Sequence, residues 1–177
     1  FLNCESPASI SCESRLTSIG YRAFGSCTSL STITLPDTVK TIGDSCFYGC
    51  AFDSINTSGV EQLGKSAFYN CANITSLEFP NVVSMGERAF YYCENLTEIT
   101  IGNKLESCEA DLNALTKVSI DSPVTDKMFM WAQNLTEITL GEGVTSIGEM
   151  AFGYCSKLKN ITLPATLTEI GDKAFWE

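Results

Sequence analysis

The sequence repeats itself, and this repetition is the feature that most restricts the fold. The stretch from Ile19 to Thr41 reads IGYRAFGSCTSLSTITLPDTVKT. The stretch from Ile147 to Glu169 reads IGEMAFGYCSKLKNITLPATLTE and aligns with it without a gap. Self-similarity at a period of about 20–50 residues is typical of repeat proteins. The sequence therefore predicts a stack of similar coils.

Two columns of residues run through the copies. Phenylalanine recurs at Phe1, Phe24, Phe47, Phe68, Phe90, Phe129, Phe152 and Phe175. A cysteine follows three residues later at Cys4, Cys27, Cys50, Cys71, Cys93 and Cys155, with Ala132 in its place once. A single coil cannot bury its apolar residues alone, so we expect both columns to face a shared interior.

Within one coil, the run from Thr32 to Leu35 alternates polar and apolar residues and predicts a half-buried strand. Pro36 ends it, because proline cannot donate to a sheet ladder. The spacing of Ala23, Phe24 and Cys27 predicts one inward face of a short helix. The expected fold class is therefore α/β, with a parallel sheet on one face and short helices or turns on the other.

We expect residues 1–177 to form a single solenoid of about seven to eight coils, with truncated coils at both ends. One irregular short coil is expected near residues 108–123, where the AF-x-x-C element is missing. We interpret it as a tolerated deletion, and a dedicated functional break is the alternative. Because the sequence begins and ends inside a repeat, we interpret it as part of a longer protein.

Composition excludes several classes of function. The net charge is −10 and acids and bases are scattered, whereas nucleic acids and anionic membranes attract clustered Lys and Arg. The sequence contains no run of about 18 apolar residues, so it predicts no membrane-spanning helix. Histidine is absent, which removes the commonest general base and Ser-His or Cys-His nucleophile pairs. We expect no enzyme activity, no cofactor and no metal.

The pattern LxxIxLPxxVxxIGxxAFxxC, read along the whole chain, resembles the BspA-like class of leucine-rich repeats. That resemblance implies a right-handed leucine-rich-repeat solenoid in a cell-surface or secreted protein, with a role in adhesion or host-protein binding. The commoner leucine-rich pattern has a column of asparagines, but here Thr38 stands at that position and no regular Asn column exists. Other polar contacts must therefore link the coils.

All nine cysteines fall at inward-facing positions. We interpret them as unbridged core thiols, because Ala132 replaces cysteine in one column and Cys46 replaces alanine in another, which favours size over redox chemistry. Disulfides between neighbouring coils and a metal site are the alternatives. An acidic cluster at Glu106, Glu109 and Asp111 could suggest calcium, but we interpret it as a solvated surface.

Five Asn-x-Ser/Thr sequons, at Asn56, Asn73, Asn95, Asn134 and Asn160, are either glycosylation sites or a by-product of the repeat. Tyrosines and a tryptophan follow the phenylalanine column and offer a second contact surface, at Tyr48, Tyr69, Tyr91, Tyr92, Tyr154 and Trp131.

The outward side chains of the strands are the main candidate site, because solenoids bind partners with extended faces. The alternative is that they only solvate the sheet. The candidate partner-binding residues are Thr32, Thr34, Asn56, Ser76, Glu78, Glu98, Thr100, Lys117, Ser119, Glu137, Thr139 and Thr162.

The sequence thus predicts a non-enzymatic protein-binding or adhesion module whose ligand is a host or extracellular-matrix protein. The alternative is a structural spacer or assembly segment of a longer repeat protein. Because uncapped coils expose their flat faces, we also expect end-to-end self-association.

Overall fold

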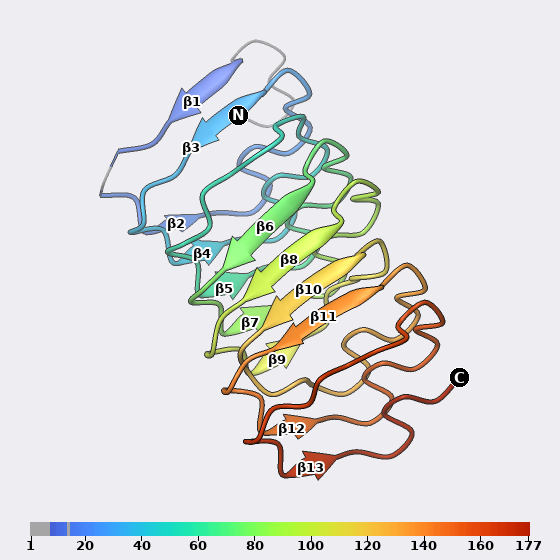
Figure 1. The fold of residues 1–177 in the computed structure, drawn as a ribbon. Helices are drawn as coiled ribbons and strands as arrows, with labels where there is room; N and C mark the ends of the chain where they lie inside the picture. The colour runs from blue at the N-terminus through green and yellow to red at the C-terminus, as the bar shows by residue number, and fades with distance from the viewer. Residues whose placement is uncertain (1–7, 14) are drawn as a thin grey trace.

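The chain forms a stack of coils in a computed structural model, which describes residues 8–13 and 15–177. Each coil brings the chain back beside its starting point, one step further along the axis (Figure 1). The molecule is a parallel β-solenoid of about seven turns with the leucine-rich-repeat fold. Phe1 and Cys4, which the repeat assigns to the two columns, lie outside the described residues.

All regular structure in the described residues is short strand. The strands are β1 (Ser9–Ser11), β2 (Ser18–Ile19), β3 (Thr32–Thr34), β4 (Thr41–Ile42), β5 (Gln62–Leu63), β6 (Ser76–Phe79), β7 (Ser84–Met85), β8 (Glu98–Ile101), β9 (Ser107–Cys108), β10 (Lys117–Ile120), β11 (Glu137–Leu140), β12 (Ser146–Ile147) and β13 (Glu169–Ile170).

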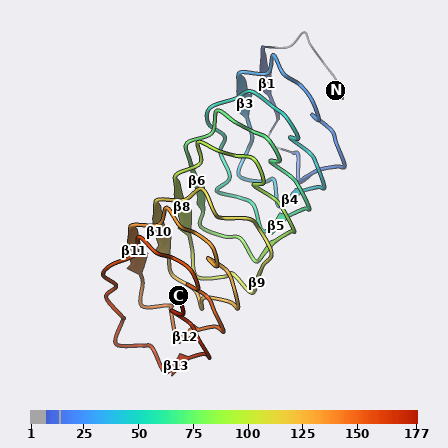
Figure 2. The same ribbon diagram turned by 90° about the vertical axis from the view of Figure 1, so that its right-hand side faces the viewer.

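Two parallel sheets form two walls of the solenoid (Figure 2). The front sheet contains β6, β8, β10 and β11 in that spatial order, and β1 pairs with β3 on the same wall nearer the N-terminus. The second sheet contains β2, β4, β5, β7 and β9, and β12 pairs with β13 beyond it. The parallel sheet predicted from the alternating runs is confirmed.

The predicted helices are wrong: the described residues contain none. The third wall, which we call the turn wall, consists of the segments 20–27, 43–50, 64–71, 86–93, 125–132 and 148–155. In five of these six segments alternate N–H groups bond to the next coil, as Phe47 does to the Ala67 carbonyl at 2.8 Å and Gly49 to the Tyr69 carbonyl at 2.8 Å. In segment 86–93 only the Arg88 N–H does so, to the Glu109 carbonyl at 3.4 Å. In an α-helix those N–H groups would instead donate to carbonyls four residues earlier in the same segment.

Left-handed backbone enforces this path. In each turn segment the residue before the Ala position and the residue before the Cys position have positive φ, for example Ser66 at 54° and Asn70 at 57°. Two left-handed residues four apart interrupt the right-handed helix that L-residues otherwise prefer. Gly49, which pays no steric penalty at φ 67°, occupies the same position as Asn70.

The interior contains columns of stacked phenylalanine rings. Neighbouring coils bring Phe24 against Phe47 at 5.5 Å between ring centroids, and Phe47 against Phe68 at 5.4 Å. Leucine and isoleucine from both sheets fill the space around the rings, and Phe47 and Phe68 are fully buried. Burying each such ring contributes roughly 1.5–3 kcal/mol, so the stacked core dominates stability.

The short coil interrupts two of the three walls. Leu96 follows Met85 by 11 residues, whereas Leu115 follows Cys108 by seven, so four residues are missing from the turn segment. The front sheet passes through unbroken, with β10 paired to both β8 and β11. The second sheet ends at β9, and Val124 resumes that wall by a bridge to Ile147.

The phenylalanine column is interrupted at the same place. Phe90 stacks on Phe68 and Phe129 stacks on Phe152, but Leu112, at 3% exposure, stands between the two halves in place of a ring. Beside the break, the hydroxyls of Ser122 and Thr125 are buried and have no hydrogen-bond partner among the described residues.

Candidate partner-binding face

The front sheet presents two rows of side chains to solvent, because residues two apart on a strand point to the same face. Pairing of β6, β8, β10 and β11 is in register. The first row is Ser76, Glu98, Lys117 and Glu137, and the second row is Glu78, Thr100, Ser119 and Thr139. Eight of the twelve predicted site residues therefore lie side by side on one surface. Lys117 and Ser119 are half-buried and the other six are exposed.

The first row alternates in charge. Lys117 lies between Glu98 and Glu137, and its Nζ is 3.5 Å from a carboxylate oxygen of Glu137. The side chains of Lys117 and Glu137 are 43% and 61% exposed, so the pair contributes about 0.2–1 kcal/mol at most. Its role in the fold is small, and the charges remain free to meet a partner.

The other four predicted site residues lie outside this four-stranded patch. Thr32 and Thr34 are exposed on β3, which pairs only with β1 among the described strands. Thr162 is exposed and lies outside any strand. Asn56 also lies outside the strands, and its side chain holds two coils together.

The Asn56 amide donates to the Leu35 carbonyl at 3.1 Å and to the Asp37 carboxylate at 2.8 Å. The hydroxyl of Ser58 donates to the same carboxylate at 2.5 Å, and these bonds hold the pKa of Asp37 below its usual range. Asn56 nevertheless borders a depression of about 250 Å³ that Ser76 and Glu78 also line. The depression lies where this coil has no front strand.

Sequence reasoning missed a row of threonines just before the front strands. The hydroxyl of Thr116 donates to the Thr97 carbonyl at 3.2 Å, and Thr136 donates to the Thr116 carbonyl at 3.1 Å. The sequence pattern that could have predicted this row is a threonine directly before each Lys or Glu that begins one of these strands. Such bonds partly replace the absent asparagine column.

Cysteine thiols also link neighbouring coils. The Cys50 Sγ donates to the Phe24 carbonyl at 3.0 Å, and the Cys71 Sγ donates to the Phe47 carbonyl at 3.0 Å. Cys12, Cys46, Cys50, Cys71, Cys93, Cys108 and Cys155 are free thiols. Desolvation by burial raises the pKa of Cys50 to about 12 and that of Cys93 to about 11. These thiols stay protonated at neutral pH, which suits donors and not nucleophiles.

Ala132 occupies the cysteine position of its coil, and a thiol there would have no carbonyl to donate to. Its preceding coil is the short one, which lacks the Phe whose carbonyl a cysteine would meet. We interpreted the exchange of alanine for cysteine as a matter of size, and this explanation was incomplete. The missing acceptor is a second reason for alanine here, beside side-chain size.

Half-buried and exposed aromatic rings line the outside of the turn wall in two groups. Tyr48 stacks on Tyr69 at 4.8 Å, and beyond the short coil Trp131 stacks on Tyr154 at 3.9 Å. Tyr92, at 52% exposure, and Trp131, at 46%, are the most open rings facing the break. This second surface and the missing AF-x-x-C element that interrupts it were both predicted from the sequence.

Three further features considered in the sequence concern metal ligands, the sequons and membrane spans. Across the described residues, no three Cys, Asp or Glu side chains converge as ligands for a metal ion. Among the sequons, the Asn73 amide donates to the Ala51 carbonyl at 2.6 Å and the Asn95 amide to the Ala72 carbonyl at 2.7 Å. A search of the described residues finds no helix long and apolar enough to cross a membrane.

The comparisons identify the class. A model of the BspA type leucine rich repeat region matches six copies over residues 1–118 and 122–177. The chain therefore belongs to the BspA-type leucine-rich-repeat family, as the resemblance predicted. No curated protein matches the sequence.

Solved structures show the same fold. A leucine-rich repeat protein of T. pallidum has a TM-score of 0.72 at 21% identity, covering 89% of this chain and 79% of its own. A leucine-rich repeat protein of Eubacterium ventriosum has a TM-score of 0.60 at 25% identity, and the match covers 97% of this chain and 43% of the other. The chain is thus a leucine-rich-repeat module.

Proposed function

We propose that this chain is a non-enzymatic protein-binding module of a cell-surface or secreted protein, and that the face of the front sheet contacts an extracellular protein of the host or the matrix. One observation carries the proposal: two registered rows of outward polar side chains cross four paired strands. A rigid sheet presents such rows without an ordering cost on binding. The family membership supports the surface location.

The face favours a polar partner surface. Glu98, Glu137 and Glu78 carry negative charge, with Lys117 in their midst, and Thr100 and Thr139 supply hydroxyls. Charge of both signs sets the register and the association rate more than the affinity. The large aromatic anchors that dominate tight interfaces are missing from these eight positions. We expect moderate affinity that weakens as salt is raised.

Binding to immobilised fibronectin, laminin and collagen tests the proposal. The double variant Thr100→Arg and Thr139→Arg places two bulky cations on the face, and retention should fall about tenfold or more. Thr28→Arg is the matched control, because Thr28 is exposed outside the strands and its side chain makes no hydrogen bond with the part of the chain that the structure describes. If neither matrix nor host-cell proteins are retained by the folded module, the proposal is wrong.

The runner-up function is a spacer or assembly segment of a longer repeat protein. It is supported by the way that coils stack, since each coil buries its apolar residues against its neighbours. Sedimentation at rising concentration tests end-to-end association, and a monomer at every concentration would count against it.

A further inference from the structure

The break in the turn wall leaves backbone hydrogen-bonding groups without partners. In intact coils Phe68 donates to the Ala89 carbonyl at 2.9 Å and Asn70 to the Tyr91 carbonyl at 2.8 Å. The corresponding donors of the next coil are the N–H groups of Phe90 and Tyr92. Among the described residues neither has an acceptor, because the short coil lacks the segment that would supply one.

On the opposite side of the break, backbone carbonyls lack donors. Beyond the short coil, the carbonyls of Asp126, Met128 and Met130 hold the register positions that accept from a preceding coil elsewhere in the wall. No described backbone N–H donates to them. Successive rungs of a parallel stack are about 4.8 Å apart, so the flanking turn segments are separated by two rungs, about 9–10 Å. A full rung of main chain is missing between the row of donors and the row of acceptors. Only the shortened segment 109–114 lies there, and its Glu109 carbonyl accepts from the Arg88 N–H at 3.4 Å.

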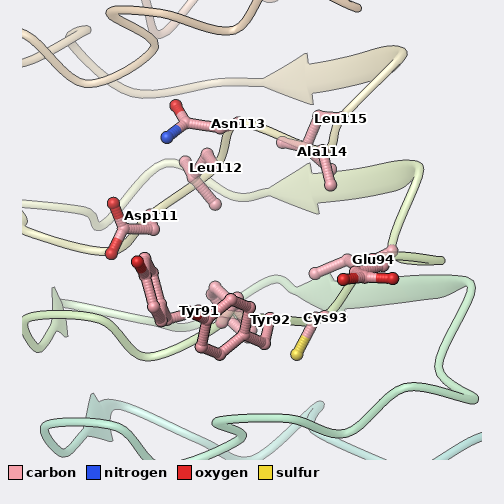
Figure 3. A pocket seen from close by; sticks show the side chains of 11 residues that line it. Tyr91, Tyr92, Cys93, Glu94, Asp111, Leu112, Asn113, Ala114 and Leu115 are labelled. Carbon is pink, nitrogen blue, oxygen red and sulfur yellow. The ribbon is translucent and has the colours of Figure 1, made fainter.

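The missing rung leaves a hollow, which we call the wall gap. On one side a pocket of about 170 Å³ is lined by Tyr91, Tyr92, Glu94 and Asp111. On the other side a pocket of about 350 Å³ shares Asp111 and extends to Trp131. Figure 3 shows Tyr91 rising toward Asp111 and Glu94 at the far end of the first pocket. The floor is apolar, because Leu112 closes the core beneath it.

The charge of the wall gap is negative. Its two pockets are lined by four acids and one base, namely Glu94, Glu109, Asp111, Asp126 and Lys127. Asp111 is half-buried, and desolvation raises its pKa above the usual range. A buried carboxylate gains most from a cation brought against it, and exposed tyrosine rings attract cations to their faces. The molecule already shows that contact, with the Arg88 guanidinium 5.7 Å from the Tyr91 ring centroid.

We propose that the wall gap binds a short peptide segment of a partner protein, whose main chain supplies the missing rung and whose lysine or arginine side chain inserts between Tyr91 and Asp111. The segment accepts from the N–H groups of Phe90 and Tyr92 and donates to carbonyls of Asp126 and Met128. Main-chain pairing gives affinity in such strand-addition complexes, and side-chain pockets give specificity. This site is separate from the front sheet and stands without the function proposed above.

Selection of random heptapeptides displayed on phage tests the proposal. Recovered peptides should be enriched in Lys or Arg at one position. Synthetic copies should bind the intact chain and slow hydrogen exchange at the Phe90 and Tyr92 amides. Asp111→Asn should weaken binding about tenfold or more, while the exposed control Glu142→Gln leaves it unchanged. The Thr100→Arg and Thr139→Arg variant should also bind normally, which separates this site from the front sheet.

A second variant closes the wall gap. Replacing residues 109–114 with the sequence GKSAFYNCAN of residues 64–73 restores a full turn segment, and it should abolish peptide binding. Recovery of peptides without a basic residue would overturn the proposal, and so would unchanged binding to either Asp111→Asn or the closed variant. Protection of the Phe90 and Tyr92 amides by a neutral oligosaccharide such as maltoheptaose, with no peptide recovered, would overturn it as well.

Discussion

The Cys93 thiol lies 2.9 Å from the carbonyl oxygen of Phe68, one coil earlier, and donates a hydrogen bond to it. The same bond recurs between Cys155 and Phe129 at 3.1 Å. Each thiol thus fills a small apolar space and satisfies the second lone pair of a buried carbonyl. This double role makes the column sensitive to substitution.

Replacing Cys71 by alanine should lower the free energy of unfolding by about 2 kcal/mol, because a cavity forms and the Phe47 carbonyl loses a donor. The reverse change, Ala132→Cys, should give no gain, since the short coil offers no carbonyl in that position. Urea unfolding followed by circular dichroism measures both. A stabilised Ala132→Cys variant would show that packing alone governs the column.

Stability should fall as the solution becomes alkaline. Burial raises the pKa of Cys93 and Cys155 to about 11 from an ordinary value of 9.0. Above pH 9 the unfolded chain loses thiol protons that the folded chain keeps, so the unfolded state binds fewer protons and is favoured. The contribution is complete below pH 9 and is lost as pH rises toward 11.

Urea unfolding from pH 8 to 11 measures this effect. Each such thiol contributes a slope of up to about 1.4 kcal/mol per pH unit. Cys93→Ala should therefore unfold at a lower urea concentration at pH 8 but lose less stability on going to pH 11. Parallel curves for the two proteins would contradict the assignment to thiols.

Ser122→Ala should stabilise the protein by about 1 kcal/mol, because the buried Ser122 hydroxyl has no partner among the described residues. Thr57 offers the opposite case: it is equally buried, but its hydroxyl donates to the Glu78 carbonyl. Thr57→Val keeps the shape and should cost about 1–2 kcal/mol. Thermal unfolding of both variants checks the contrast, and a destabilised Ser122→Ala would show that the hydroxyl is paired.

Phe68→Ala should be among the most damaging substitutions, costing about 3–5 kcal/mol. Phe68 is fully buried and stacks on rings of both neighbouring coils, Phe47 at 5.4 Å and Phe90 at 5.8 Å. Phe175 stacks on Phe152 alone and is 42% exposed, so Phe175→Ala should cost about 1 kcal/mol or less. Chemical unfolding of the two variants measures the difference, and equal costs would mean that the rings act independently of the stack.

The repeat made much of the fold predictable. Leu30, Ile33 and Leu35 recur with a spacing that only an inward-facing strand position explains, and the parallel sheet followed from stacking them. The helix prediction failed for a physical reason. The spacing of Ala23, Phe24 and Cys27 fits a helix face, but inter-coil hydrogen bonds compete for the same donors. The sequence does hold one indication of turns in place of helices. Glycine and asparagine readily adopt positive φ, and they occur at Gly49 and Asn70.

The candidate site was predictable in part. The period of two along the strands places Glu98 and Thr100 outward, and register across the sheet brings them beside Lys117 and Ser119. The sequence could not show that Asn56 is bonded to Leu35 and Asp37, since those contacts cross between coils. Nor could it show that a four-residue deletion leaves donors at Phe90 and Tyr92 unpaired, because which groups pair is decided by the neighbouring coil.

The wall gap has a mechanical consequence. At the short coil only the front sheet carries main-chain hydrogen bonds continuously from one half of the molecule to the other, through β8, β10 and β11. A tensile load along the axis is therefore borne on one side there, and the stack should bend open at that seam before either half unravels. Under force, we expect the molecule to extend in two steps, first by bending at the short coil and then by unfolding of the two halves.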